Sequence, residues 1–253
     1  MRATNGRNAD KAAALMQHNN IKLLELDVTD SAAVVAAVAT ILQLERRIDA
    51  VVNNAGVYPT GITESFTEED LRQAQDVNVS GPWRVMRAVL PSMRQRGAGL
   101  IINISSTAGR FSPPFIALYS TKYALEGFVE GLHYEVRPLG VNVVLLQPGA
   151  FPTEIFGKTW SGSDAALAAG YGTQAEVPAQ IESGIRHMFE ALKPNPQLVA
   201  DAVLKLLELP QGQRPLRTVV DPVTGAIIEA ANQQVGHQYR QFLTAFGMQA
   251  LLN

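Results

Sequence analysis

The chain has 253 residues, 47% hydrophobic and 17% charged, which suffices to bury the core of a single α/β domain. A formal net charge of −2 excludes a strongly basic surface, so we expect neither nucleic acid nor an anionic membrane as a partner. The chain has no cysteine, its four histidines are widely separated, and no apolar stretch is long enough to span a membrane, so we expect no metal site and a cytoplasmic location.

Short apolar runs alternate with helical patterns along the chain, which is typical of βαβ units and a parallel sheet. The β-rich runs predicted as strands are 21–28, 48–53, 100–105, 141–147 and 217–221. Helices are predicted from Ser31 after the Asp30 cap, and over 68–96, 119–137, 195–209 and 226–246, the last within a C-terminal helical segment at 226–253. Between them, the Gly- and Ala-rich residues 152–194 are predicted to form a substrate lid.

The N-terminal end departs from this plan. Residues 8–17 have helical character and lead directly into the run at 21–28, with no strand and no glycine-rich turn before them. In a dinucleotide-binding fold, the first βα turn carries the glycines that let backbone amides approach a pyrophosphate. The alternation of elements predicts a doubly wound parallel sheet in one domain, residues 1–253, without such a turn.

Six short motifs occur at the ends of the predicted elements. In chain order they are LDVTD at 26–30, NNAG at 53–56, NVSG at 78–81, NISSTAG at 103–109, Tyr119 followed by Lys122, and PGAFPT at 148–153. With these motifs in this order, the chain resembles the short-chain dehydrogenase/reductase family from residue 1 to about residue 221. The resemblance implies a Rossmann-like sheet that lacks its first strand and glycine-rich turn, a nicotinamide dinucleotide cofactor, and hydride transfer to or from a substrate.

A tyrosine and a lysine are the candidates for proton transfer. A phenol with an ordinary pKa near 10 exchanges its proton slowly near neutrality, but a nearby ammonium and a positively charged nicotinamide favour the phenolate. Tyr119 is therefore a candidate general acid/base and Lys122 the group that tunes it. Ser106 can hydrogen-bond the substrate oxygen, and the resemblance places Asn78 beside a proton-relay water. A half-buried packing tyrosine and a serine that only caps a turn remain the alternatives.

The carboxyl ends of the predicted strands meet at one crevice, where an open parallel sheet binds its ligand. The residues expected to bind the cofactor there are Asp27, Val28, Asn53, Ala55, Gly56, Tyr119, Lys122, Pro148, Gly149 and Thr153. By resemblance Asp27 meets the adenine ring and Thr153 the nicotinamide carboxamide, although Asp27 could equally cap a turn. Arg2, in the turn expected at residues 1–8, favours the 2′-phosphate of NADP; NAD and a solvated terminal arginine remain alternatives.

Two departures from the family bear on activity. Loss of the first strand would leave its neighbour with an open apolar edge and the chain unstable or prone to association. A start codon assigned to an internal methionine would explain the loss, and an in-frame glycine-rich turn in the upstream DNA is the test of that hypothesis.

The second departure is in the helix of the candidate site. Tyr119 and Lys122 are three residues apart where the family spaces them by four, so either a local distortion of the helix absorbs the difference or catalysis is impaired.

The sequence thus predicts an NAD(P)-dependent oxidoreductase that interconverts a secondary alcohol and a ketone, with Tyr119 as general acid/base. Residues flanking the expected crevice indicate a small apolar substrate, with ordinary packing as the alternative. These residues are Phe111, Pro113, Pro114, Phe115, Phe151, Ile155 and Phe156. A dinucleotide-sensing or interaction protein on the same scaffold is the alternative function, whereas the absence of a G-x-S-x-G motif argues against a hydrolase. The resemblance also implies a homodimer or homotetramer formed through helices 68–96 and 119–137.

Overall fold

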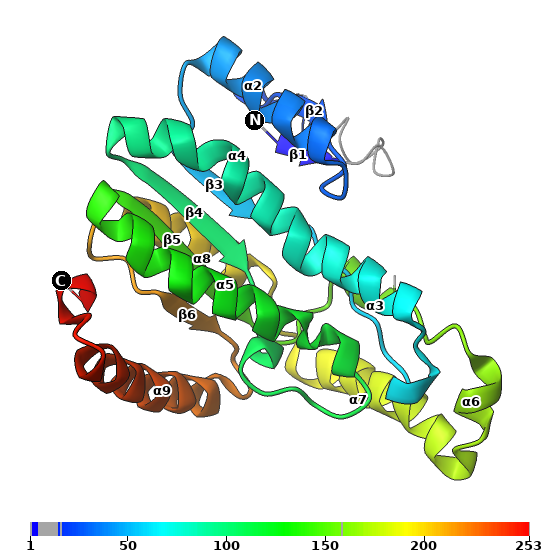
Figure 1. The fold of residues 1–253 in the computed structure, drawn as a ribbon. Coiled ribbons are helices and arrows are strands. Elements are labelled where there is room, and N and C mark those ends of the chain that lie inside the picture. The colour runs from blue at the N-terminus through cyan, green and yellow to red at the C-terminus, as the bar shows by residue number, and fades with distance from the viewer. Residues whose placement is uncertain (1, 5–14, 16, 158, 253) are drawn as a thin grey trace.

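The computed structural model describes residues 2–4, 15, 17–157 and 159–252, and every structural statement below concerns these residues. Their strands form two parallel sheets (Figure 1). The smaller sheet pairs β1 (Arg2–Thr4) with β2 (Leu23–Glu25), and the larger has the order β3 (Ala50–Asn53), β4 (Gly99–Ile104), β5 (Val141–Pro148) and β6 (Arg217–Val220). All the predicted strands are present, and the α/β class is confirmed.

Strand β1 corrects two predictions for the N-terminal end. The sequence pattern predicts no strand before residue 21, yet β1 pairs in parallel with β2, with Arg2 opposite Leu23. Arg2 therefore lies within a strand and not in the turn expected at residues 1–8. Three residues are too few for an apolar run to be recognised, because the alternation that identifies strands needs at least four. The helix predicted over residues 8–17 lies almost wholly outside the described residues.

Three helices cover one face of the larger sheet and its edge: α2 (Ser31–Glu45), α4 (Gly81–Arg96) and α5 (Thr121–Val136) (Figure 1). Helix α2 begins where predicted, since the Asp30 carboxylate accepts hydrogen bonds from the backbone N–H groups of Ala32 and Ala33. The apolar faces of the three helices meet the sheet in one core that includes Met86, Leu125 and Leu145, all at most 1% exposed. This core fixes α5, and with it Lys122, relative to β4 and β5.

The helix predicted over residues 68–96 is a composite of three segments. Helix α3 (Glu68–Gln75) begins with a capping box in which the side chains of Thr67 and Asp70 each accept a backbone N–H of the other residue. A single π-helical turn follows at Asp76–Ser80, and α4 continues from Gly81. Such π turns are frequent at functional sites, and this one contains Asn78.

Helix α8 (Gln197–Glu208) covers the opposite face of the larger sheet, and α9 (Gly225–Ala245) lies against β6 (Figure 1). A second core joins α8 to the sheet through Leu100, Val144 and Leu206, each at most 2% exposed. Both helices agree with the predictions for 195–209 and 226–246. None of the described helices is long and apolar enough to cross a membrane.

The predicted lid at 152–194 is mostly helical. It contains α6 (Ala165–Ala169) and the longer α7 (Val177–Leu192), neither of which was predicted. Its Ser163 is tied to the start of α3, because the hydroxyl donates to Asp70 Oδ1 at 2.7 Å and the backbone N–H to Oδ2 at 3.1 Å. The segment is therefore attached to the body of the domain beside the carboxyl ends of the strands.

The two sheets are separated at β3. Within the described residues β3 pairs only with β4, and no strand links its other edge to the β1–β2 sheet. Val52, at the middle of β3, is 41% exposed, although valine in a parallel strand is normally covered on both faces. An open edge of this kind is predicted for a sheet without its first strand, and here it forms one wall of a large cavity.

Candidate active site

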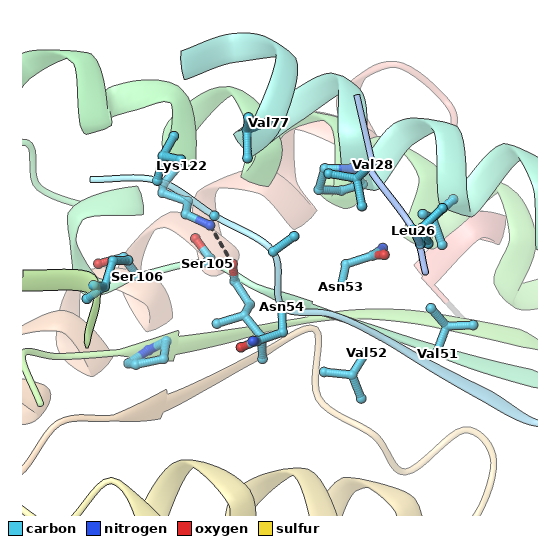
Figure 2. A pocket seen from close by; sticks show the side chains of 18 of the residues that line it. Leu26, Val28, Val51, Val52, Asn53, Asn54, Val77, Ser105, Ser106 and Lys122 are labelled. Carbon is cyan, nitrogen blue, oxygen red and sulfur yellow. Dashed lines mark hydrogen bonds between the residues drawn. The ribbon is translucent and has the colours of Figure 1, made fainter. Parts of the chain in front are cut away.

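A cavity of about 2910 Å³ runs along the carboxyl ends of the strands and the open edge of β3. Its lining includes every residue predicted to bind the cofactor except Arg2, whose side chain is not described. Figure 2 shows Leu26 and Val28 facing Val51 and Val52 at one end, with Ser106 and Lys122 at the other. Ligand pockets typically measure about 300–1,000 Å³, so this cavity has room for more than a small substrate.

Tyr119 lies at the polar end of the cavity. Its ring makes an edge contact with Tyr58 at 4.9 Å between centroids, and the Ser106 side chain is close enough to act on its phenol. Burial raises the pKa of Tyr119 to about 12, because the phenolate would lose its hydration, while the Ser106 side chain opposes that shift. The phenol is therefore held in its protonated form, ready to donate.

Lys122 approaches the same point from the first turn of α5. Its Nζ lies 6.0 Å from the centroid of the Tyr119 ring and donates to the backbone oxygen of Ile104 at 2.7 Å. The side chain is only 4% exposed, and burial lowers its pKa to about 8, with Glu126 opposing the shift. A Cβ built on Gly56 would lie 3.6 Å from Nζ, so the loop after β3 also reaches this point.

The start of the helix is distorted between Tyr119 and Lys122, which are three residues apart. Tyr119 belongs to a 3-10 turn at Ala117–Ser120, and the regular α-helix begins only at Thr121. A 3-10 turn advances about 120° per residue, compared with about 100° in an α-helix, so its tighter winding changes the direction of the tyrosine relative to the lysine. The structure therefore has a local distortion at this point, and the effect of the short spacing on catalysis stays a prediction.

The titration of Lys122 should be visible in the stability of the protein. Because its folded-state pKa of about 8 lies below the usual 10.5, the unfolded chain binds more protons between these values, and stability rises with pH there. The free energy of unfolding of Lys122→Met lacks this pH dependence. We therefore expect the unmodified protein to gain about 2 kcal/mol of stability relative to Lys122→Met between about pH 7 and about pH 9.5. Chemical denaturation across this range measures it. The control is Lys205→Met, at an exposed position of α8, which keeps Lys122. Its stability difference from the unmodified protein should stay constant over this pH range.

Asn78 does not line the cavity, and its place beside a proton-relay water stays a prediction. It is fully buried in the π turn, and its Oδ1 accepts the backbone N–H of Val57 at 2.9 Å. Its Nδ2 donates to the Val57 oxygen at 3.0 Å and to Thr121 Oγ1 at 2.9 Å. Both amide hydrogens are thus used to join the loop after β3 to the start of α5, which makes Asn78 a positioning residue in this structure.

Removing this amide should be costly. We expect Asn78→Ala to lower the free energy of unfolding by about 2–4 kcal/mol, because the N–H and C=O of Val57 lose their partner. Thr121→Val removes only one of the three hydrogen bonds and should cost about 1 kcal/mol. Equal losses in the two variants, measured by denaturant unfolding, would contradict this assignment.

Ser106 and the loop after β3 are held by their own local hydrogen bonds. Ser106 Oγ accepts the N–H of Ala108 at 3.1 Å, so it caps a short turn in addition to contacting Tyr119. Asn53 Nδ2 donates to Asn103 Oδ1 at 2.8 Å, which links the ends of β3 and β4. The turn-capping alternative considered for Ser106 is therefore real, and it coexists with the position of Ser106 in the cavity wall.

The remaining predicted cofactor residues form the two ends of the wall. Asp27 Oδ1 accepts the N–H and the hydroxyl of Thr29 at 2.9 and 2.7 Å, the turn-capping arrangement anticipated as an alternative. At the other end, a Cβ on Gly149 would lie 2.3 Å from Asp221 Cγ, so only glycine fits between β5 and β6 there. Pro148 and Thr153 line the cavity beside it.

The apolar wall differs in part from the prediction. Pro113, Phe151, Ile155 and Phe156 line the cavity, whereas Phe111, Pro114 and Phe115 do not. The wall also contains Tyr58, Ile116 and Trp160, which the sequence analysis did not identify. No local signal marks these residues, because the loop contacts that bring them here involve distant parts of the chain; the Thr60 N–H, for example, donates to the Trp160 oxygen at 3.0 Å.

The groups gathered at the polar end of the cavity are a phenol, an ammonium and a hydroxyl group, those of Tyr119, Lys122 and Ser106. In the described part of the chain, no three histidine, aspartate or glutamate side chains lie close enough together to hold a metal ion. The protein's own side chains at this site are therefore suited to proton transfer and hydrogen bonding.

Comparison with known proteins gives this arrangement a family. The family model described as short chain dehydrogenase matches residues 2–164. A 3-ketodihydrosphingosine reductase from Bacteroides thetaiotaomicron is 41% identical over 134 residues, which are 53% of this chain and 50% of that protein. The chain belongs to the short chain dehydrogenase family, as the sequence motifs indicated. It spans about half the length of this relative.

Solved structures agree with this assignment. A short-chain dehydrogenase from Streptomyces avermitilis superposes with a TM-score of 0.73 at 27% identity, over 97% of this chain and 86% of that one. The NAD+-bound structure of a xylitol dehydrogenase superposes with a TM-score of 0.55, also at 27% identity, over 60% of each chain. The doubly wound α/β fold predicted from the sequence is thereby confirmed.

Proposed function

We propose that the protein is an NAD(P)-dependent oxidoreductase that interconverts a ketone and a secondary alcohol. The observation that carries the proposal is the grouping of Tyr119, Ser106 and Lys122 at the polar end of one cavity. Its family membership and the NAD+ bound to a solved relative support a nicotinamide dinucleotide as cofactor. Arg2, the sequence-based reason for expecting NADP, lies in β1 and not in the expected turn, so we propose either NADP or NAD as the cofactor.

The cavity fits the nicotinamide half of such a cofactor. Pro148, Gly149 and Thr153 line the same cavity as Tyr119, and Gly149 packs closely on Asp221. Lys122 presents a buried ammonium in this cavity. When bound, the nicotinamide supplies or accepts the hydride. Asp27 and Val28 would hold the adenine half at the opposite end of the same cavity.

The protein's own part in the reaction is to move one proton. Since burial keeps the Tyr119 phenol protonated, the tyrosine is prepared to act as the acid that protonates the oxygen of a ketone. Ser106 hydrogen-bonds that oxygen and stabilises the charge that develops on it. The Lys122 ammonium stabilises the resulting phenolate, which lowers the cost of the transfer. Because the Tyr119 phenol is protonated before cofactor and substrate bind, we propose that the site is prepared to reduce ketones.

The substrate we propose is a small apolar ketone or alcohol. Tyr58, Phe156 and Trp160 line the cavity, and the rings of Tyr58 and Phe156 contact each other at 5.2 Å between centroids. These side chains offer apolar surface and leave the polar contacts to the end that holds Ser106 and Tyr119. The 3-ketodihydrosphingosine reductase among the relatives supports the same class of reaction.

The test is a turnover assay with the purified chain. The protein would be mixed with NADPH or NADH and a panel of ketones of increasing apolar size, and the loss of nicotinamide absorbance recorded. Oxidation of the cofactor that requires a ketone supports the proposal. Binding of cofactor, seen by calorimetry, without turnover of any ketone would favour the alternative of a dinucleotide-sensing protein instead.

We also propose that the chain forms a homodimer or homotetramer through α3, α4 and α5. Trp83 on α4 and Phe128 on α5 are 42% and 53% exposed, and their rings lie 6.0 Å apart. An exposed aromatic pair on adjoining helices is typical of an interface core. We expect Trp83→Ser combined with Phe128→Ser to shift the protein to monomer in analytical ultracentrifugation. Val35→Ser, at an exposed site on α2, is the control.

A further inference from the structure

A buried carboxylate lies directly behind the site, and the proposed reaction does not use it. Glu126, one helical turn after Lys122 on α5, is 3% exposed. Its Oε1 accepts hydrogen bonds from Ser105 Oγ and Gln147 Nε2, both at 2.7 Å. Its Oε2 accepts one from Arg217 Nε at 2.9 Å and lies 3.5 Å from Arg110 Nη2.

The partners of Glu126 adjoin the site on three sides. Ser105 immediately precedes Ser106, and Gln147 immediately precedes Pro148 at the start of the loop proposed to face the nicotinamide. Lys122 lies one turn earlier on the same face of α5, where residues four apart are neighbours. A single carboxylate thus contacts or adjoins the segments that carry the hydroxyl, the ammonium and the cofactor loop.

These contacts close into a ring of buried polar groups. Asn232 on α9 donates from Nδ2 to Gln147 Oε1 at 2.6 Å and accepts from Arg110 Nε at 2.9 Å. The ring therefore passes from Glu126 through Gln147, Asn232 and Arg110, and the ion pair of Arg110 with Glu126 closes it. Gly109 leaves the space for it, since a Cβ there would lie 2.4 Å from Glu126 Oε1. A buried network of this kind specifies one geometry for the backbone around it.

The charges in this cluster are balanced. Two carboxylates, Glu126 and Glu130, face two guanidinium groups, those of Arg110 and Arg217, and Arg217 Nη1 donates to Glu130 Oε1 at 3.1 Å. The groups that act on Lys122 from its surroundings are Glu126 on its own helix and Tyr119 in the preceding turn. Removal of the Glu126 charge would leave an excess of positive charge next to the buried Lys122 ammonium.

We propose that Glu126 is a positioning residue that holds Ser106, Lys122 and the loop at 148–153 in the arrangement the reaction needs. The inference rests on the proposed oxidoreductase function for its kinetic consequence. Its geometric part does not depend on turnover, because it concerns how the protein's own side chains are arranged and charged.

The test compares Glu126→Gln with Glu130→Gln. Glu130 is on the same helix and binds the same arginine, but it contacts neither Ser105 nor Gln147 in the described structure, so it is the matched control. We expect Glu126→Gln to lower kcat by about 10²-fold with little change in KM, since small displacements of reacting groups have effects of this size. Glu130→Gln should change kcat much less.

A second measurement needs no activity. In protein labelled with ¹³C at lysine Cε, the NMR signal of Lys122, assigned by its loss in Lys122→Met, reports its titration. We expect the midpoint to fall by about one pH unit in Glu126→Gln and to stay within a few tenths in Glu130→Gln. If no variant shows turnover, the proposed function fails, and this titration still decides the role of Glu126.

Ser105→Ala keeps the proposal testable if Glu126→Gln does not fold. It removes one hydrogen bond and no charge, so we expect it to fold, to lose activity by up to about 10-fold and to leave the Lys122 titration unchanged. The proposal is overturned if Glu126→Gln lowers only the stability, with kcat and the Lys122 titration the same as in Glu130→Gln. It is also overturned if Ser105→Ala shifts the Lys122 titration as much as Glu126→Gln does.

Discussion

Replacement of Tyr119 by phenylalanine is expected to lower kcat by about 10²- to 10⁴-fold, the range attributable to a positioned proton donor. The change removes one oxygen atom and keeps the ring, so the edge contact with Tyr58 is preserved. The cofactor should still bind, because the phenol contributes the proton and not the main surface of the cavity. Initial rates of ketone reduction and calorimetric titration with NADPH measure the two effects separately.

Tyr123 supplies the control for this substitution. It lies four residues further along, on the first turns of α5, and its hydroxyl donates to the backbone oxygen of Arg110 outside the cavity. Tyr123→Phe removes the same atom from a side chain that is 41% exposed. If both variants lose activity equally, or if Tyr119→Phe retains most of its activity, Tyr119 is not the proton donor.

A strand, a glycine-rich turn and a helix fused in front of Arg2 are expected to raise the melting temperature by on the order of 10 °C. The new strand would lie along the open edge of β3 and cover Val52, which is 41% exposed. The turn would bring backbone N–H groups to the pyrophosphate of the cofactor at a helix N-terminus. We therefore also expect dinucleotide affinity to increase by about 10²-fold.

The two effects of this fusion are separable. A fusion whose turn glycines are replaced by valine keeps the apolar strand but blocks close approach to a phosphate, so it should raise the melting temperature without improving affinity. Differential scanning calorimetry and cofactor titration of both fusions decide the matter. An affinity gain shared equally by the valine fusion would show that filling the cavity, and not the turn, controls cofactor binding.

The sequence predicted the larger sheet well because β4 and β5 consist of apolar residues buried on both faces, which leave a nearly continuous pattern. Helix α7 was missed. None of its residues is buried, and the Gly- and Ala-rich composition of the segment around it indicated a loop. Strand β1 was missed because a three-residue strand is specified by its pairing with β2 and not by its own composition.

The candidate site could also be predicted from the sequence only in part. Ser106, Tyr119 and Lys122 could be named from the sequence because each belongs to a short motif at the end of a predicted element. The burial of Asn78 and the ring around Glu126 could not. Both depend on hydrogen bonds between residues far apart in the chain, such as Asn232 with Gln147, and no local spacing reports such contacts.

The chain carries two tryptophans, and they lie at different places. Trp160 lines the cavity near Phe156, whereas Trp83 is 42% exposed on α4 beside Phe128. Their fluorescence would therefore report different events. Quenching of Trp160 by a reduced nicotinamide would follow occupation of the cavity, and a blue shift of Trp83 would follow association of chains. In Trp83→Phe only Trp160 remains, so its fluorescence follows the cavity. In Trp160→Phe only Trp83 remains, so its fluorescence follows the association of chains.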